Sequence, residues 1–409
     1  MKRILIVKLW ALGDILMATP LLRALKRQWP DCEITWLADK GYAGVLEDNP
    51  LLTGVIPFDS GAWRRHWRYG RFWSYWRMSQ ALRRDLRRRR FDVVINLAGE
   101  KWWSVWFNVA PITVGLFPRA EPGRMGRLYT HALPRADNPW VHNTTHYLRP
   151  AAALGIPGPY DERMVMGLSP RHRAAVRDFL YSQPGYDPRK PLVVLHPGAS
   201  QDSKCWPAAS FAAVAATLHG RFNVVLTGSP KERALAEAIV AALPAGTPPP
   251  LIAAGRLPHI GQTAALVAQA AAVVTGDTSV LHISSALGTP LVGIYGSTRP
   301  GDNAPLFGPR VLLHDDSVPC APCYKADCPL RGDAHLRCQR AVTPAQVLAA
   351  LESLLGETQE GREEPGREEP AIEIAAQGAD AECPPARTRN GPSHVRAGGH
   401  SAEGYSAAN

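Results

Sequence analysis

Short apolar runs alternate with longer amphipathic stretches along most of the chain. One series of runs occupies residues 4–9, 33–38, 54–58 and 92–98, and a second occupies residues 191–198, 222–228, 250–255, 272–277 and 290–296. Continuous apolar runs are typical of strands that are buried on both faces of a parallel sheet, and helices then occupy the stretches between them. The pattern therefore predicts two doubly wound α/β units.

The two series of runs are separated by a segment rich in proline and glycine. SQPGYDPRKP lies within residues 171–190, which we interpret as a linker. We predict an α/β chain whose two Rossmann-like domains, residues 1–170 and 191–355, face a cleft. Residues 356–409 contain the repeat GREEPGREEP and almost no aromatic side chains, so we expect a disordered tail there.

The composition is that of a globular protein. The chain has 409 residues, of which 45% are hydrophobic and 20% charged, and no apolar run approaches the ~20 residues of a membrane-spanning helix. The N-terminal MKRILIVKLWALGD resembles the start of a signal peptide, but its apolar part is short and lacks a cleavage site. We therefore expect a cytoplasmic protein, and seven cysteines in that compartment argue against a disulfide framework.

The net charge of +10 predicts attraction to an anionic partner. Residues 63–90, WRRHWRYGRFWSYWRMSQALRRDLRRRR, hold many of the arginines, interleaved with tryptophans. This segment predicts one basic, aromatic surface. The alternative is a helix whose buried side consists of Phe72, Trp76, Leu82 and Leu86, with a solvated opposite face.

Residues 274–290, VTGDTSVLHISSALGTP, predict a buried strand, a polar turn and a helix that ends at Gly288. Asp277, Thr278 and Ser279 would lie at the helix N-terminus, where the backbone amides favour a phosphate. His282 lies four residues after Thr278 and therefore on the same helical face. An ordinary helix cap and a structural histidine are the alternative interpretation.

Two further loops follow strands of the second series. Residues 196–207, HPGASQDSKCWP, contain Lys204, which could contact a diphosphate, although a solvated lysine is the simpler interpretation. Residues 227–237, TGSPKERALAE, contain Glu232, whose carboxylate could accept hydrogen bonds from a ribose. A Gly-Asp pair, Gly13 and Asp14, directly follows the first strand, and from the residues alone Asp14 is best interpreted as a helix N-cap.

Together these motifs resemble glycosyltransferase family 9, the lipopolysaccharide heptosyltransferases. The resemblance rests on KLWALGDILMATPLLRALKRQWPDCEITWL, HPGAS with KCWP, TGDTSVLHISSALGTP, YGSTRPGDNAP and CAPCYKADCP, and covers about residues 1–355. It implies the GT-B fold, an acceptor-binding N-terminal domain and a C-terminal domain for the nucleotide sugar. It further implies inverting, metal-independent transfer of a heptose from ADP-heptose to the inner core, on Kdo-lipid A or an already heptosylated core.

The resemblance also implies roles for individual residues. Asp14 is the general base, and Lys204 stabilises the departing diphosphate. The donor-binding residues are Ser200, Glu232, Asp277, Thr278, Ser279 and His282. Ser279 departs from the family pattern, which often has glycine after the Asp-Thr pair, and its side chain could alter how closely the donor phosphate approaches.

On this interpretation the basic aromatic surface meets an acceptor that carries phosphates and carboxylates at a membrane surface. The acceptor-binding candidates are Gly13, Arg64, Arg65, Arg68, His146 and Arg149. The resemblance thus implies a peripheral protein on the cytoplasmic face of the inner membrane.

Four cysteines, Cys320, Cys323, Cys328 and Cys338, have the spacing C-x2-C-x4-C-x9-C. Such a set could hold zinc or an iron-sulfur cluster. The family often has this pattern without any metal in its chemistry, so we expect neither a metal nor another cofactor.

Two other hypotheses remain open from the sequence. A GT-B enzyme could use another nucleotide-sugar donor or glycan acceptor, since the fold and the diphosphate loops say little about the sugar. An arginine-rich nucleic-acid-binding module is the alternative outside enzymes. Against it, the arginines crowd one segment while the two phosphate-type loops lie in the other domain, so we expect no nucleic-acid partner.

Overall fold

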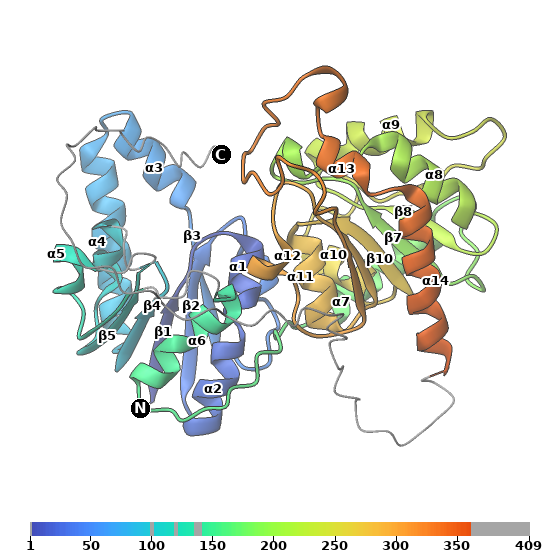
Figure 1. Cartoon of the computed structure of the whole chain (residues 1–409). Helices are drawn as coiled ribbons and strands as arrows, with labels where there is room; N and C mark the ends of the chain where they lie inside the picture. The colour runs from blue at the N-terminus through green and yellow to red at the C-terminus, as the bar shows by residue number, and fades with distance from the viewer. Residues whose placement is uncertain (1, 99–101, 118–121, 135–140, 361–409) are drawn as a thin grey trace, which may run out of the picture. The chain divides into compact units, whose positions relative to one another are not determined.

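The computed structural model describes residues 2–98, 102–117, 122–134 and 141–360, and these residues contain two parallel six-stranded sheets (Figure 1). The strands of the first sheet are β1 (Arg3–Val7), β2 (Glu33–Asp39), β3 (Gly54–Phe58), β4 (Val93–Asn96), β5 (Ile112–Leu116) and β6 (His131–Leu133). Those of the second are β7 (Leu192–His196), β8 (Asn223–Leu226), β9 (Leu251–Ile252), β10 (Ala272–Gly276), β11 (Leu291–Ile294) and β12 (Arg310–Leu313).

Helices connect successive strands, as parallel pairing requires. In the first half they are α1 (Leu12–Met17), α2 (Pro20–Gln28), η1 (Ala43–Val45), α3 (Ser60–Arg68), α4 (Phe72–Arg88), η2 (Trp102–Phe107), α5 (Gly123–Gly126) and α6 (Asn143–Ala153). In the second they are α7 (Pro170–Tyr181), η3 (Asp202–Lys204), α8 (Ala208–Leu218), η4 (Pro230–Glu232), α9 (Arg233–Ala241), α10 (Ile260–Val267), α11 (Ser279–Leu287), α12 (Pro300–Asn303), η5 (Gly332–Ala334), α13 (Arg337–Ala341) and α14 (Pro344–Glu360).

Both sheets have the strand order of a doubly wound fold. The first runs β3-β2-β1-β4-β5-β6 and the second β12-β11-β10-β7-β8-β9, so the order reverses beside β1 and beside β7. Ligands of such sheets bind at the carboxyl ends of the strands next to this reversal. The loops after β1, β7 and β10 are therefore the places where a site is expected, and they carry Asp14, Lys204 and Asp277.

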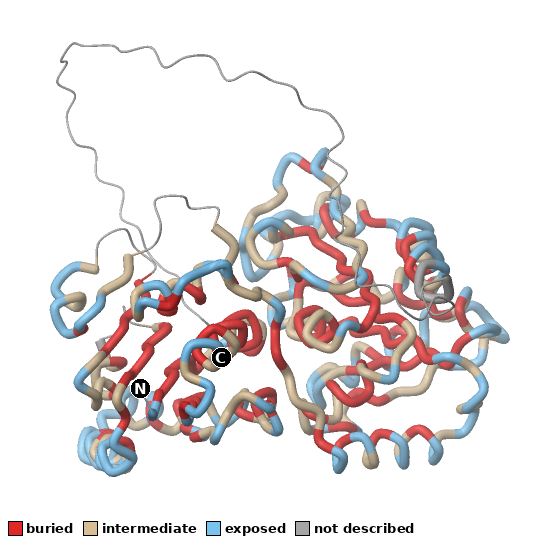
Figure 2. The backbone as a smooth tube through the Cα atoms, turned by 90° about the horizontal axis from the view of Figure 1, so that it is seen from below, coloured by how far each residue is buried: buried red, intermediate tan, exposed pale blue. Residues whose placement is uncertain are grey.

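The nine predicted strands are confirmed, and the structure adds β5, β6 and β12. Of these, β6 has three residues and β12 is only half-buried, so the apolar pattern of both is weak. The five residues of β5, ITVGL, are mostly buried, and the sequence analysis missed this strand. By contrast, β7, β8 and β10 are buried along their whole length (Figure 2).

Apolar side chains form three buried clusters. One covers the face of the first sheet that packs on α3, α4 and η2, and another covers the face of the second sheet that packs on α8, α9 and α14. The third contains residues of both sheets, with α1, α2, α6, α7, α10 and α11. The inner helices of the two halves therefore share one continuous core.

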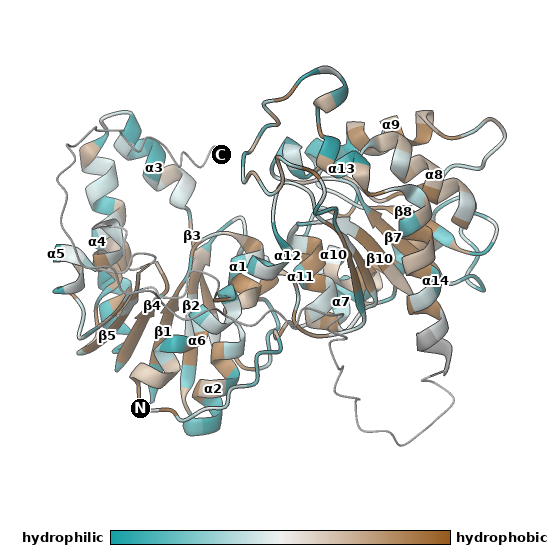
Figure 3. Cartoon of the chain, in the orientation of Figure 1, coloured by the Kyte–Doolittle hydropathy of each residue, from teal (hydrophilic) through white to brown (hydrophobic). Residues whose placement is uncertain are grey.

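Helices α3 and α4 carry the basic aromatic segment and are largely hydrophilic, whereas the strands beside them are apolar (Figure 3). Trp63 stacks on Tyr75 at a centroid distance of 4.8 Å, and this contact turns Tyr75 toward the core. Leu86 is buried as the alternative helix interpretation required, but Phe72 is 59% and Trp76 47% exposed. That interpretation was therefore wrong for Phe72 and Trp76, which lie in solvent with Trp67, Tyr69 and Trp73.

The ends of the predicted domains coincide with helices. Helix α7 begins at Pro170 and covers residues 171–181 of the segment interpreted as a linker, and α14 continues to Glu360, which lies in the segment predicted as a tail. The rest of the predicted tail lies outside the described residues. None of the helices in the described ranges combines the length and the hydropathy that a membrane crossing demands.

Candidate active site

Asp14 lies in the first turn of α1, directly after the carboxyl end of β1. The N-cap of this helix is Ala11, so the capping role considered for Asp14 was wrong. The Lys8 ammonium lies 3.1 Å from Asp14 Oδ2 and donates to the Tyr147 hydroxyl at 3.0 Å. The loop after β1 and helix α6, whose contacting residues are 139 positions apart in the sequence, thus meet at Lys8.

Lys8 is buried, and Asp14 and Tyr147 stabilise its charged form. Burial alone would lower the pKa of Lys8, but the negative charge of Asp14 and the Tyr147 hydroxyl outweigh it, so the pKa is raised above its ordinary value. Burial, and then the charge of Asp14, raise the pKa of Tyr147 to about 12. Lys8 is therefore a fixed cation, and it orients the Asp14 carboxylate, of which 31% remains exposed to solvent.

A second ion pair lies at the strand reversal of the other sheet. Lys204 Nζ lies 2.7 Å from Asp277 Oδ2, and the two side chains are 17% and 4% exposed. Thr298 donates to the same carboxylate oxygen at 2.8 Å, and Asn303 donates to the other at 3.1 Å. Burial disfavours the Asp277 carboxylate, but the charge of Lys204 and these hydrogen bonds hold its pKa below the usual range. Asp277 therefore fixes the position of Lys204.

The polar turn after β10 begins α11 as the sequence indicates. Thr278 is the N-cap and accepts a hydrogen bond from the Val280 amide, and the helix ends at Gly288 in the left-handed conformation. Thr278 and Ser279 are partly exposed at this helix N-terminus, and Ser200 is exposed in the loop after β7. The N-terminal amides of α11 carry partial positive charge and can bind an anion.

Glu232 contacts both the loop after β7 and the loop after β8. Its Oε2 accepts a hydrogen bond of 2.6 Å from the Ser229 amide, and its side chain fills the space that a Cβ on Gly198 would occupy. Gly198 is thus required for the close approach of Glu232.

His282 connects the two ion pairs. It is buried on α11, and a Cβ on Gly13 would lie 2.7 Å from its Cδ2, so α1 can contact α11 only because residue 13 is glycine. Burial lowers the pKa of His282 to about 4, while the charges of Asp277 and Asp14 act in the opposite direction. Both carboxylates are therefore within electrostatic range of one neutral imidazole.

A second contact joins α6 to the loop after α12. His142 Nδ1 accepts a hydrogen bond from the Thr144 amide at the start of α6, and Nε2 lies 2.8 Å from the Ala304 carbonyl oxygen. This pair of partners assigns the proton to Nε2, which donates to Ala304.

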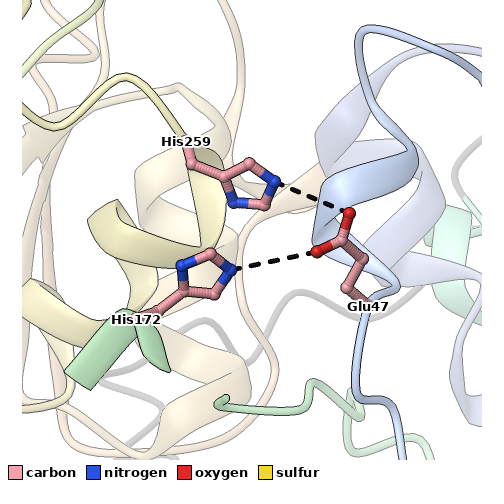
Figure 4. Close-up of side chains that lie close together, drawn as sticks. All are labelled: Glu47, His172 and His259. Atoms are coloured by element: carbon pink, nitrogen blue, oxygen red, sulfur yellow. Dashed lines mark ion pairs between the residues drawn. The ribbon is translucent and has the colours of Figure 1, made fainter. Parts of the chain in front are cut away.

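A third contact brings Glu47, from the first half, to His172 and His259 (Figure 4). The two imidazoles stack at a centroid distance of 4.4 Å, and their Nε2 atoms lie 3.9 and 3.6 Å from the Glu47 oxygens. The three side chains have the residue types of a metal site. However, His259 Nδ1 accepts from the Gly261 amide, so its Nε2 carries the proton, and Arg171 already pairs with Glu47 at 2.6 Å. We interpret the group as a polar contact between the halves.

The acceptor-binding candidates lie on α3, α6 and the loop between β1 and α1. The Arg64 guanidinium stacks over the Trp10 ring at 5.3 Å, and Trp10 donates to Ser60, so α3 is tied to the loop that leads to Asp14. Arg65 and Arg68 are exposed on the same helix.

The other two candidates, His146 and Arg149, lie on α6, the helix that carries Tyr147. The His146 ring lies 6.0 Å from that of Tyr147. Arg149 donates to the Pro134 carbonyl, so its guanidinium is engaged with the chain itself.

The sequence reasoning missed Lys8, Tyr147, Thr298, Asn303 and His142. Lys8 is the first charged residue after an apolar strand, which is a usable signal. The other four are recognisable only once distant segments are brought together.

Comparisons with known proteins show the family of the chain. The model of glycosyltransferase family 9 (heptosyltransferase) matches residues 79–333. The chain is 28% identical to lipopolysaccharide heptosyltransferase 1 of Pseudomonas aeruginosa over 371 residues, which cover 86% of the chain and 98% of that relative.

Two solved structures show the same fold. A family 9 glycosyltransferase from Veillonella parvula superposes with a TM-score of 0.72 at 22% identity, covering 87% of this chain and 97% of its own. The ADP-heptose LPS heptosyltransferase II of E. coli gives 0.68 at 23% identity, covering 88% and 100%. The fold is thus GT-B, and the protein belongs to glycosyltransferase family 9, the heptosyltransferase family.

Proposed function

We propose that this protein transfers a heptose from ADP-heptose to the inner core of lipopolysaccharide, with inversion at the anomeric carbon and without a metal ion in the reaction. Family membership supports the reaction class, and the named relatives support the sugar and the acceptor. The observation that carries the proposal is the packing of Gly13, next to Asp14, on His282 of α11, the helix that follows Asp277. This contact brings a carboxylate and the cation of the Lys204–Asp277 pair on opposite halves toward one place, which is what the transfer needs.

In this proposal Asp14 is the general base. The acceptor hydroxyl oxygen attacks the anomeric carbon on the face opposite the diphosphate, and its proton passes to an Asp14 oxygen. The new glycosidic C–O bond forms as the bond to the diphosphate oxygen breaks, which inverts the centre. Lys8 holds the carboxylate in place and balances its charge until the proton arrives.

Lys204 stabilises the leaving ADP. Negative charge grows on the departing oxygen, so a fixed cation lowers the barrier more than it tightens ground-state binding. In this proposal the backbone amides at Thr278 and Ser279, at the N-terminus of α11, bind phosphate oxygens, and Ser200 in the loop after β7 is a further donor-binding candidate. Because these groups supply the positive charge, we propose that no divalent metal bridges the diphosphate.

The nucleotide and the acceptor would bind on opposite halves. Glu232 is a candidate for the ribose hydroxyls, and Arg64, beside the Asp14 loop, is a candidate for acidic groups of the acceptor. The exposed tryptophans of α3 and α4 are suited to a membrane interface, so we propose a peripheral location at the cytoplasmic face of the inner membrane.

The decisive test is a reaction with purified acceptor. We expect ADP release that depends on acceptor and continues with EDTA and without added metal, together with a product whose mass increases by one heptose. UDP-sugars should be poor donors, and a deletion strain should lack a core heptose. Release of another nucleotide, or a lipopolysaccharide of unchanged mass, would overturn the proposal.

A further inference from the structure

We propose that His142 is a positioning residue that couples the nucleotide side of the site to the Asp14 side, through the hydrogen bond that it donates to Ala304. The inference deepens the proposed function and rests on it for the roles of Asp14 and Lys204. It arises from two sets of hydrogen bonds that meet at one imidazole.

The first set ties residues 298–304, the α12 segment, to Asp277. Thr298 donates to Asp277 Oδ2 at 2.8 Å, and Asn303 donates to Oδ1 at 3.1 Å. Lys204 Nζ lies 2.7 Å from Oδ2 as well. Both carboxylate oxygens are thus held by the α12 segment, and a shift of Asp277 must move this segment or break one of its hydrogen bonds.

The end of the α12 segment contacts the first half of the chain. Ala304 is the C-cap of α12, where its amide donates to the Pro300 carbonyl at 2.8 Å. Its own carbonyl accepts a hydrogen bond of 2.8 Å from His142 Nε2. The Tyr324 hydroxyl donates to Asp302 and holds α12 from the other side. Ala304 is buried, so its carbonyl is a shielded acceptor that moves only together with α12.

The second set of hydrogen bonds starts at the other nitrogen of the imidazole. His142 is the N-cap of α6, and its Nδ1 accepts from the Thr144 amide at 3.2 Å. The same helix carries Tyr147, whose hydroxyl accepts from Lys8 at 3.0 Å. Lys8 in turn donates to Asp14 Oδ2 at 3.1 Å. One imidazole therefore joins α12 to the helix that positions the proposed base.

Donor binding acts on this connection from the nucleotide side. A diphosphate that contacts Lys204 competes with Asp277 for the ammonium. The Asp277 carboxylate then depends more on its two donors from the α12 segment, so the segment adjusts with it. The adjustment reaches α6 through His142. Because coupling between two sites is reciprocal, an ordered α6 favours the donor-bound arrangement in return.

Two substitutions separate this role from that of an ordinary helix cap. His142→Asn keeps an acceptor near the position of Nδ1, and asparagine is a favoured N-cap, so α6 stays capped while the bond to Ala304 is lost. His142→Gln places an amide donor near the position of Nε2, so the bond to Ala304 is kept while the cap is weakened. We expect His142→Asn to melt close to wild type and His142→Gln to melt about 2 to 5 °C lower.

Hydrogen exchange of the full-length chain, with and without ADP, measures the coupling. In wild type and in His142→Gln, ADP should slow exchange of the amides of residues 144–149 by about 5-fold or more. In His142→Asn it should leave these amides unchanged, although calorimetry should show that ADP binds all three proteins. Without nucleotide, Asn303→Ala should speed exchange of the same amides in the wild-type background and have no such effect in the His142→Asn background.

Steady-state kinetics gives a second readout. With both substrates saturating, His142→Asn should turn over roughly 5- to 20-fold more slowly than wild type, while the KM for the donor changes less than the maximal rate. His142→Gln should stay within about twofold of wild type. A structural role alone predicts the opposite order, in which the better-capped Asn variant is the faster one.

The inference is wrong if ADP protects α6 equally in wild type and His142→Asn, or if His142→Gln is the slower of the two variants. Failure of ADP to bind the wild-type protein would instead contradict the proposed function. The exchange comparison with Asn303→Ala uses no nucleotide, so it still decides whether His142 connects α12 to α6. The two failures are therefore distinguishable.

Discussion

At the scale of single residues, the candidate site consists of two ion pairs with different degrees of exposure. Asp14 is partly exposed beside the buried Lys8, so its carboxylate can reach an acceptor while its partner stays fixed. Asp277 is almost fully buried and satisfied by three donors, so it can act on a ligand only through Lys204. A base should be accessible and a positioning residue need not be, which matches the proposed division of roles.

Replacing Asp14 tests its proposed role as the general base. We expect Asp14→Asn to lower the transfer rate roughly 10²- to 10⁴-fold, because the amide cannot accept the acceptor proton. ADP binding, measured by calorimetry, should stay close to that of wild type, since Lys204 and α11 lie on the other half. The control is Asp31→Asn, which neutralises an exposed carboxylate before β2. Near-normal turnover in Asp14→Asn would remove Asp14 from the mechanism.

The Lys204–Asp277 pair requires a design that separates stability from catalysis. Lys204→Ala leaves a buried carboxylate without its cation, which is destabilising in itself. Lys204→Ala/Asp277→Asn removes both charges and should recover much of the melting temperature. It should not recover the maximal rate, because the cation that stabilises the leaving group is still absent.

Lys204→Arg refines the same test. It keeps the charge but replaces a compact ammonium with a planar fork, so partial recovery of the rate is the most we expect. Steady-state kinetics with limiting and saturating donor measures the maximal rate and the apparent affinity for the donor. A double variant that regains activity together with stability would show that Lys204 serves only the fold.

At the scale of elements, the sequence predicted most of the architecture because the strands next to each reversal are continuously apolar and end in recognisable polar loops. The edge strand β6 is short and the edge strand β12 is only half-buried, so neither shows a clear apolar run in the sequence. The partners within the site were beyond prediction for a different reason. Lys8 meets Tyr147 across 139 residues, and nothing local to either residue indicates the other.

Helix α4 shows how periodicity can assign the wrong face. Aromatic side chains are large and apolar, so Phe72 and Trp76 suggested a buried stripe with Leu86. The stacking of Trp63 on Tyr75 instead turns Tyr75 inward and leaves Trp73 75% exposed. An exposed aromatic cluster among arginines is unusual for a solvated helix and favours an interface.

Vesicle binding tests whether the exposed aromatic side chains of α3 and α4 contact a membrane. We expect Trp73→Ala/Trp76→Ala to weaken binding to phosphatidylglycerol vesicles at least several-fold while leaving the melting temperature unchanged, because both side chains lie in solvent. Binding of wild type should weaken with salt as the arginine charges are screened. Tyr181→Ala, which removes an exposed aromatic side chain from α7, should bind like wild type. Equal binding by all three proteins would contradict a membrane role for α3 and α4.

At the scale of the whole chain, buried imidazoles lie at the contacts between the two halves. His282 packs on Gly13, His142 donates to Ala304, and His172 Nε2 lies 3.9 Å from a Glu47 oxygen. Burial lowers the pKa of His142, His172 and His282, and also of His196 at the end of β7. The folded chain therefore requires these side chains without their protons.

The direction of the pH dependence follows from linkage. A histidine whose pKa is lower in the folded chain than its ordinary value of about 6.5 binds more protons when the chain is unfolded. Its stabilising contribution is complete above about pH 6.5 and is lost as the pH falls through the folded pKa, which for His282 is about 4. We therefore expect the melting temperature to be constant from pH 8 to 7 and to fall steadily from pH 6.5 to 4.5.

His282→Gln isolates the contribution of the histidine whose pKa in the folded chain is about 4. The amide cannot titrate, so the variant should show a shallower fall in melting temperature between pH 6.5 and 4.5, even if its stability at pH 8 is lower than that of wild type. The control, His219→Gln, replaces a partly exposed histidine at the end of α8 and should reproduce the wild-type slope. Differential scanning calorimetry at matched ionic strength measures all three profiles. A wild-type melting temperature that rises on acidification, or identical slopes for wild type and His282→Gln, would show that the imidazole between Asp14 and Asp277 is not held neutral by the fold.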